Sequence, residues 1–125
     1  MTHFKHGHIT KAIIDAFYRL YYSHRRGYRE QEFANALALE LRRRGHSVRT
    51  QVSIHRRYQG RLVGTGKVDL VVDNLVAVEI KNVRRLNQKH ELQLRSYLTD
   101  GGWPVGLLLN YGTDEPQVRR LERKS

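Results

Sequence analysis

The sequence predicts an α/β fold in which the elements follow the order ααβββαβ, and three observations support this. Apolar residues recur at helical spacing in two segments before residue 45. The period then changes to the alternation that is typical of strands, over residues 48–83. A further helical segment at residues 87–99 precedes a short apolar strand at residues 105–111. The 125 residues are expected to form a single domain, 1–125, with its core at about residues 7–112.

Two helices are expected in the N-terminal third of the chain. Residues 8–24 carry one apolar stripe, which consists of Ile9, Ile13, Ala16, Phe17, Leu20 and Tyr21. Two arginines and a glycine at residues 25–27 interrupt this helix. A second helix is predicted at about residues 29–44, with apolar residues one turn apart at Phe33, Leu37 and Leu41. A basic run suits the negative end of its dipole, and Gly45 suits the position after its last turn.

The strands follow the second helix. Three are expected, separated by the turn sequences Gln-Gly and Asp-Asn, at residues 48–58, 61–72 and 75–83. The third is rich in β-branched residues, which is typical of a buried strand. Residues 113–125 are polar and are expected to be a tail that frays, although Val118 and Leu121 could pack against the domain.

The composition excludes several classes of protein. The chain has no cysteine, so disulfides, thiolate zinc sites and cysteine nucleophiles are all excluded. No stretch approaches 18 consecutive apolar residues, as a membrane span would require. The N-terminus also lacks the basic and then apolar pattern of a signal peptide. We therefore expect a cytoplasmic protein without a membrane partner.

The charge of the chain favours a polyanionic partner. Lys and Arg number 23 against 12 acidic residues, which gives a net charge of +11 at pH 7. Much of the excess lies in short clusters, among them Arg56–Arg57 and Arg84–Arg85. The alternatives are a basic surface that only keeps the protein in solution and binding to anionic lipid. No basic amphipathic helix with a lipid-seeking apolar face is evident, so nucleic acid is the preferred partner.

Two acidic residues are expected to face each other in the hairpin of the second and third strands. Alternation places Val68, Leu70 and Val72 on one face of the second strand, with Asp69 on the other. If Leu70 pairs with Val78, Asp69 lies directly across from Glu79, with about 5 Å between the Cβ atoms. A register shift of one residue would place the two acids on opposite faces.

The chemistry of this pair suits a metal ion. Two facing carboxylates repel each other, whereas Mg²⁺ prefers oxygen ligands and is held in proteins by one or two carboxylates. Lys81 shares the face of Glu79 and could stabilise developing charge or orient a water molecule. The alternative is a pair of surface acids in salt bridges with Lys67 and Lys81, each worth under ~1 kcal/mol. The facing Asp69 and the basic surroundings favour a site.

Three further residues are weaker candidates. Gln93 and Tyr97 lie one helical turn apart, so an amide and a phenol could together hold a phosphate or a water molecule. Tyr97 could equally be a core aromatic residue. Glu30 opens the second helix, where favourable interaction with the helix dipole is the alternative role.

Together these residues resemble the PD-(D/E)XK nuclease superfamily and, within it, the small GxxExxY family. Residues 27–33 (GYREQEF) look like the name motif, with Phe33 where the family has Tyr. Val68–Asp69 followed by residues 79–81 (EIK) matches the nuclease core, with Val68 in place of the eponymous Pro. Residues 93–97 (QLRSY) are similar to the QxxxY motif of RecB-like members, and residues 105–111 look like the closing strand. The resemblance covers about residues 7–112.

The resemblance implies both a fold and a set of site residues. The fold would be a restriction-endonuclease-like αβββαβ core with a mixed four-stranded sheet flanked by helices, plus an extra N-terminal helix. The site would lie where the sheet is splayed. Metal would be held by Glu30, Asp69 and Glu79, with the carbonyl of Ile80 as a further ligand. Lys81 would be catalytic, supported by Gln93 and Tyr97. His90 lies one turn before Gln93 and could contact phosphate, unless it is simply a surface histidine.

The preferred function is hydrolysis of DNA phosphodiester bonds with Mg²⁺ or Mn²⁺ as cofactor. The QxxxY resemblance favours single-stranded DNA or DNA ends, and the arginines Arg56, Arg57, Arg84 and Arg85 would contact phosphates without reading sequence. One alternative is a nucleic-acid-binding module that does not cleave, and another is an RNA-directed or partner-dependent nuclease subunit. The sequence does not choose between endonuclease and exonuclease, or between a monomer and a homodimer formed through the first helix.

Overall fold

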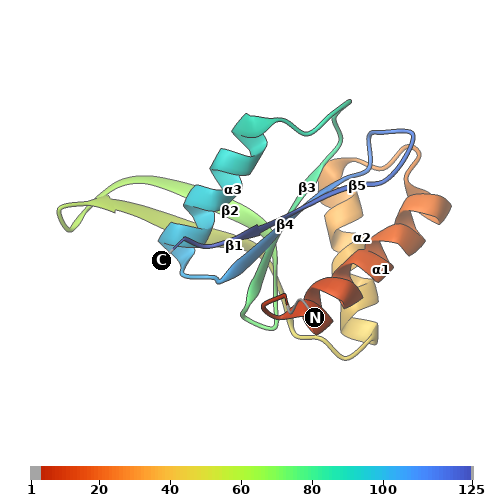
Figure 1. The fold of residues 1–125 in the computed structure, drawn as a ribbon, viewed down its shortest axis with the longest axis horizontal. Coiled ribbons are helices and arrows are strands. Elements are labelled where there is room, and N and C mark those ends of the chain that lie inside the picture. Colours follow the sequence, from red (N-terminus) through yellow and green to blue (C-terminus); the bar gives the residue numbers. More distant parts are fainter. Residues whose placement is uncertain (1–3, 125) are drawn as a thin grey trace.

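The computed structural model describes residues 4–124 as an α/β structure with one sheet between two helical layers (Figure 1). The helices are α1 (Gly7–His24), α2 (Glu30–Arg43) and α3 (Gln88–Gly101). The strands are β1 (Val48–Tyr58), β2 (Arg61–Val72), β3 (Val76–Lys81), β4 (Val105–Asn110) and β5 (Gln117–Glu122). They lie in the order β1-β2-β3-β4-β5, with β3 and β4 parallel and the other neighbours antiparallel. The predicted α/β class, the flanking helices and the extra N-terminal helix are confirmed.

The predicted number of strands is wrong by one. Residues 117–122, which we expected within a fraying tail, form β5 and pair with β4 along its whole length. As an edge strand, β5 has one exposed side, so most of its residues are polar and only Leu121 is fully buried. A single buried residue does not produce the apolar alternation by which a strand is recognised in sequence.

Local signals explain where the helices begin and end. At the start of α2, the backbone N–H of Arg29 donates to Glu32 Oε1 (2.9 Å). At the start of α3, the side chain of Asn87 accepts from His90 N (3.2 Å), and His90 Nδ1 accepts from Asn87 N (3.1 Å). Gly102 ends α3 with φ 81°, a conformation that favours glycine.

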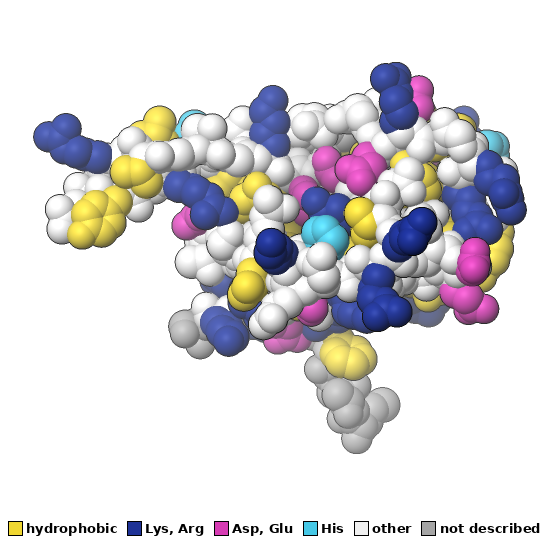
Figure 2. All heavy atoms as spheres, turned by 90° about the horizontal axis from the view of Figure 1, so that it is seen from above, with side chains coloured by type: hydrophobic (Ala, Val, Ile, Leu, Met, Phe, Trp, Pro, Cys, Tyr) yellow, Lys and Arg dark blue, Asp and Glu magenta, His cyan; other side chains and the backbone are white. Residues whose placement is uncertain are grey.

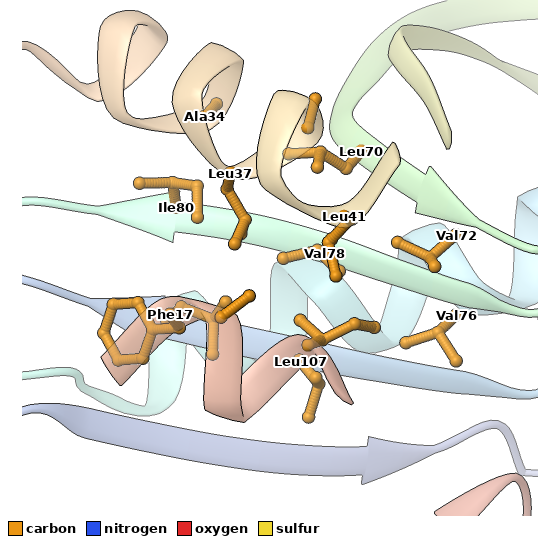
Figure 3. Packing of buried hydrophobic residues seen from close by; sticks show 14 of the residues in the cluster. Phe17, Ala34, Leu37, Leu41, Leu70, Val72, Val76, Val78, Ile80 and Leu107 are labelled. Atoms are coloured by element: carbon orange, nitrogen blue, oxygen red, sulfur yellow. The ribbon is translucent and has the colours of Figure 1, made fainter. Parts of the chain in front are cut away.

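Each face of the sheet has its own apolar core. Helices α1 and α2 pack on one face, where Leu37 and Leu41 of α2 meet residues such as Val78 and Leu107 of the central strands (Figure 3). Helix α3 packs on the other face through Leu94, Tyr97 and Leu98. Strand β3 lies between both layers and is buried from Val76 to Ile80, which explains its apolar, β-branched sequence.

Strands β2 and β3 separate part-way along their length. Their ladder consists of Leu70↔Val78, Val71↔Ala77 and Val72↔Val76, whereas β2 continues to pair with β1 as far as Arg61. Val68 and Val71 both lie in the α3-side core, although strict alternation would place them on opposite faces. The prediction that Val68 shares a face with Leu70 and Val72 is therefore wrong. The alternation is interrupted at Asp69, which falls with Gln51 (φ 50°) in the gap of the β1–β2 ladder between the pairs Thr50↔Leu70 and Val52↔Val68.

The separation leaves the far part of the β1–β2 hairpin beyond the rest of the sheet. We call residues 53–67 the hairpin arm. Figure 1 shows it as a two-stranded ribbon that extends past the other strands.

In the part of the chain that the structure describes, no helix combines the length and the apolar character needed to cross a bilayer.

Candidate active site

Two carboxylates converge at the point where β2 and β3 separate. Leu70 pairs with Val78, so the predicted register is confirmed and Asp69 faces Glu79. Asp69 N donates to Glu79 Oε1 (3.0 Å), and Ile80 N donates to Asp69 Oδ2 (2.8 Å). The two side chains therefore accept hydrogen bonds from backbone N–H groups at the point where the ladder between the strands ends. Burial of N–H groups requires such partners, so the two acids also stabilise the fork between the strands.

A lysine and a glutamine complete the surroundings of the pair. Lys81 Nζ lies 3.7 Å from Glu79 Oε2, and its side chain is largely buried. Gln51 Nε2 donates to Asp69 Oδ1 (3.3 Å) from the neighbouring strand β1. Sequence reasoning missed Gln51, since a glutamine in a polar stretch of a strand carries no signal of its own. Only the β1–β2 register, which brings Gln51 next to Asp69 between the pairs Thr50↔Leu70 and Val52↔Val68, could have indicated it.

Burial makes the negative charges of this pair costly. The pKa of Glu79, which is only 7% exposed, is raised from 4.5 to about 8, first by desolvation and then by the charge of Asp69. Desolvation also raises the pKa of Asp69, against hydrogen bonds from Ile80 and Gln51 and the charge of Lys81, which lower it. Lys81 therefore offsets the repulsion only in part. The two acids and Lys81 form a site that attracts additional positive charge.

Glu30 lies at the edge of this site. Its Oε2 accepts a hydrogen bond from Asn82 N (2.8 Å), directly after the end of β3. Its charge raises the pKa of both Asp69 and Glu79. Nevertheless, among residues 4–124 no three histidine or acidic side chains come close enough together to hold one ion. The structure therefore brings Asp69, Glu79 and Lys81 together and leaves Glu30 beside them.

The two predicted residues of α3 lie beside the fork. Tyr97 packs against β2 at Gly66, where a Cβ atom would come within 2.9 Å of the tyrosine ring. Gln93 is exposed one turn earlier. Within residues 4–124, neither side chain has a hydrogen bond to the two carboxylates.

The predicted phosphate-binding residues divide into two groups. Arg57, Arg84 and Arg85 are exposed. Arg56, in contrast, is bound to α3: it donates to Ser96 Oγ (2.7 Å), lies 3.6 Å from a carboxylate oxygen of Asp100 and covers the ring of Tyr97. The predicted His90 is half-buried and closes the N-terminal turn of α3.

Comparison with known proteins identifies the superfamily of this chain. The family profile described as the PD-(D/E)XK nuclease superfamily matches residues 7–121. The chain belongs to the PD-(D/E)XK nuclease superfamily. The match covers most of the chain and includes all of the strands up to Leu121 in β5. The superfamily indicates a nuclease, and hence an enzyme that binds nucleic acid.

One solved structure supports the fold of this superfamily member. The structure titled "Crystal structure of SSO0001" superposes on this chain with a TM-score of 0.54, and the two sequences are 19% identical. The match covers 99% of this chain and 71% of that chain. At this identity the likeness concerns the fold alone. No curated protein matches the sequence.

A buried amide of this nuclease-superfamily chain was also missed in the sequence. Asn110, at the end of β4, is fully buried, and its Oδ1 accepts from Val83 N (3.0 Å) and Gly112 N (3.0 Å). Its Nδ2 donates to Val83 O (2.9 Å) and Gln117 Oε1 (3.0 Å). Asn110 thereby holds the segment that follows Lys81.

Proposed function

We propose that the protein is a metal-dependent nuclease that hydrolyses DNA phosphodiester bonds at the Asp69–Glu79 pair. The observation that carries the proposal is the convergence of these two carboxylates beside Lys81, in a chain of a nuclease superfamily. The single domain would act in the cytoplasm. Membership of the GxxExxY family, with its motif at residues 27–33, is part of the proposal.

The residues of the pair fit a hard divalent cation. All of their donor atoms are carboxylate oxygens, and burial makes their negative charge costly without a counter-ion. Asp69 and Glu79 would hold Mg²⁺ or Mn²⁺, with Glu30 and the Ile80 carbonyl as further ligands. This role requires Glu30 to turn towards the pair, because its carboxylate accepts a hydrogen bond from Asn82 N and forms no cluster of three ligands with the pair among residues 4–124. A bound ion of this kind polarises a phosphodiester and lowers the pKa of a water molecule.

The neighbouring residues would bind and orient the substrate. Lys81 Nζ, 3.7 Å from Glu79, is close enough to place a positive charge beside a phosphoryl oxygen held at the pair. Gln93 and Tyr97 would support the site from α3. This role requires the exposed Gln93 side chain to turn towards the fork, because it lacks a hydrogen bond to the pair within residues 4–124.

Exposed cations would bind the rest of the nucleic acid. Arg57, Arg84 and Arg85 would contact phosphates, which supplies affinity but little sequence specificity. Figure 2 shows Lys and Arg side chains spread over the face that is seen there. Single-stranded DNA or DNA ends are the preferred substrate because residues 93–97 are similar to the QxxxY motif.

Cleavage assays with matched variants test the proposal. Purified protein is incubated with labelled DNA and RNA, single- and double-stranded, with Mg²⁺, Mn²⁺ or EDTA. Cleavage of DNA should require the metal and should fall at least about a hundredfold in Lys81→Ala and Asp69→Asn. Lys89→Ala, which removes an exposed lysine of α3, should cleave as the unmodified protein does.

Each of the other outcomes has a defined meaning. Cleavage that survives EDTA and both substitutions would contradict the proposed site. Binding without cleavage under any metal would favour a nucleic-acid-binding module, and metal-dependent cleavage of RNA alone would favour an RNA-directed enzyme. Activity that appears only at protein concentrations where sedimentation detects a dimer would make the homodimer the active form.

A further inference from the structure

We propose that the hairpin arm, residues 53–67, binds a double-helical DNA segment next to the cleavage site and reads its groove. The inference rests on the proposed function in one respect: the position of the cleavage site. That site is proposed at Asp69, and the arm ends at Lys67, two residues away. It goes further in choosing between the two preferred substrates: it assigns a DNA end, with the double-helical part of that DNA beside the point where the strand is cut. It also assigns a role to residues of the arm outside the carboxylate site.

The arm is a firmly held ribbon. At its base, Arg56 joins it to Ser96 and Asp100 of α3, and Ile54 is buried in the α3-side core. Gly66 allows Tyr97 to lie directly against it. At its tip, Gln59 (φ 49°) and Gly60 (φ 79°) form a two-residue turn with positive φ at both positions, which matches the twist of the flanking strands. The arm therefore needs little ordering on binding, which lowers the entropic cost.

The charge of the arm is entirely of one sign. Residues 53–67 contain three arginines and one lysine, and they contain no Asp or Glu. Arg56 is paired with Asp100, but Arg57, Arg61 and Lys67 are exposed. Figure 2 shows the arm as a projection at the left that carries Lys and Arg side chains along its length. A polyanion is the partner that such a ribbon fits.

One face of the arm lies against α3, and the other face is exposed. The cross-strand pairs Ile54↔Gly66 and Arg56↔Gly64 face α3. The alternate pairs Ser53↔Lys67 and His55↔Thr65 are exposed. This second face thus presents two hydroxyl groups, an imidazole and an ammonium group. Such groups donate to and accept from the edges of bases.

The tip of the arm exposes apolar side chains where folding does not require them. Tyr58 is 66% exposed, Leu62 51% and Val63 67%. These residues lie beside Arg57 and Arg61, so the apolar tip is flanked by cations. Apolar side chains bind thymine methyl groups in the major groove and can also be inserted between bases.

Dimensions favour double-helical DNA over the other nucleic acids. The major groove of B-DNA is about 12 Å wide and admits a two-stranded ribbon, whereas the deep and narrow major groove of RNA duplexes does not. The eight steps along the strand from Asp69 to Arg61, at about 3.3 Å each, span about 26 Å. At about 3.4 Å per base pair, the tip lies about eight base pairs from the carboxylate pair.

Binding assays without cleavage test this role. Fluorescence anisotropy in EDTA measures the affinity of the protein for three nucleic acids of equal length: a DNA duplex, single-stranded DNA and an RNA duplex. Each is about 20 base pairs or nucleotides long, which exceeds the eight base pairs that the arm spans. In Arg57→Ala/Arg61→Ala, the affinity for the DNA duplex should fall at least about tenfold and the slope of log K against log salt should fall by about two. The affinities for the other two should fall less than about threefold.

Two matched controls accompany this variant. Arg119→Ala/Lys124→Ala removes the same charge from exposed positions on and after β5 and should retain duplex affinity within about twofold. Leu62→Ser should weaken duplex binding, whereas Leu39→Ser, at a site on α2 that is 61% exposed, should not. Thermal denaturation monitors the fold of every variant.

The outcomes distinguish this inference from the proposed function. Equal losses on all three nucleic acids, or an equal loss in the β5 control, would overturn the role of the arm and leave cleavage at Asp69 and Glu79 untouched. A larger loss on single-stranded DNA or on RNA duplex would overturn it in favour of that polymer. A protein that shows the selective loss but cuts nothing would support the arm and contradict the nuclease.

Discussion

Replacement of Glu79 by glutamine should stabilise the metal-free protein at alkaline pH. Burial and Asp69 raise the pKa of Glu79 from 4.5 to about 8, so the folded protein keeps a proton between these values that the unfolded chain releases. The stability of the fold therefore falls as pH rises through this window, and the full cost is present above about pH 8. Glutamine does not ionise and can still accept the hydrogen bond from Asp69 N.

The structure sets an upper limit on this effect. The difference between about 8 and 4.5, at about 1.4 kcal/mol for each pH unit, corresponds to at most about 5 kcal/mol. Loss of the contact with Lys81 Nζ, 3.7 Å away, reduces the gain. For a domain of this size, 1 kcal/mol shifts the melting temperature by about 4 °C. We therefore expect Glu79→Gln to melt at least about 5 °C higher than the unmodified protein at pH about 9, and within about 2 °C of it at pH about 5.

Thermal denaturation in EDTA, followed by circular dichroism at several pH values, measures this difference. Glu115→Gln, in the exposed loop before β5, is the matched control and should leave the melting temperature unchanged at each pH. An equal shift for Glu79→Gln at both ends of the pH range, or a variant less stable at alkaline pH, would refute the reasoning. The cost of the buried charge would then be absent.

Three further predictions concern the metal and the packing around the site. Protons compete with metal for Asp69 and Glu79, whose pKa values are raised, so the rise in melting temperature on addition of Mn²⁺ should grow between about pH 5 and pH 8. Asp69→Asn should abolish this rise. A rise that is independent of pH would contradict metal binding at the pair. Asn110→Ala should lower the free energy of unfolding in urea by about 1–3 kcal/mol, since it leaves the part-buried backbone N–H and C=O groups of Val83 without their side-chain partner. A loss below about 0.5 kcal/mol would show that water replaces the amide. Gly66→Ala should cost about 1–3 kcal/mol in the same assay, because its Cβ would lie within 2.9 Å of Tyr97; a neutral effect would mean that the tyrosine ring moves freely.

Much of the fold and the centre of the site could be predicted because they depend on local patterns. The apolar stripe of α1 and the β-branched sequence of β3 each reflect burial against a layer of the protein, which periodicity reports directly. The turn between β2 and β3 occupies residues 73–75, and the pairing Leu70↔Val78 that follows from it places Asp69 opposite Glu79. The acid pair was therefore within reach of reasoning from one hairpin.

Other features arise from contacts between distant segments. Leu121 alone marks the burial of β5, and only the open edge of β4 decides that a polar segment pairs there. The hydrogen bonds of Asn110 reach Val83 across 27 residues, a distance that no local pattern encodes. Arg56 and Arg57 are adjacent in sequence, yet Arg56 is bound to α3 and Arg57 is exposed, because the two side chains leave the strand in different directions.

The sequence by itself determined the helices and the first four strands, since hydrophobic period is a property of neighbouring residues. It reduced the facing of Asp69 and Glu79 to one condition, the pairing of Leu70 with Val78, which the structure meets. The tertiary structure decided that β2 and β3 part at Asp69, that Gln51 joins the site and that the arm extends beyond the sheet. These features arise from contacts between segments that are far apart in the chain, such as those of α3 with Ile54 and Val68. The spacing of residues along one segment does not encode such contacts.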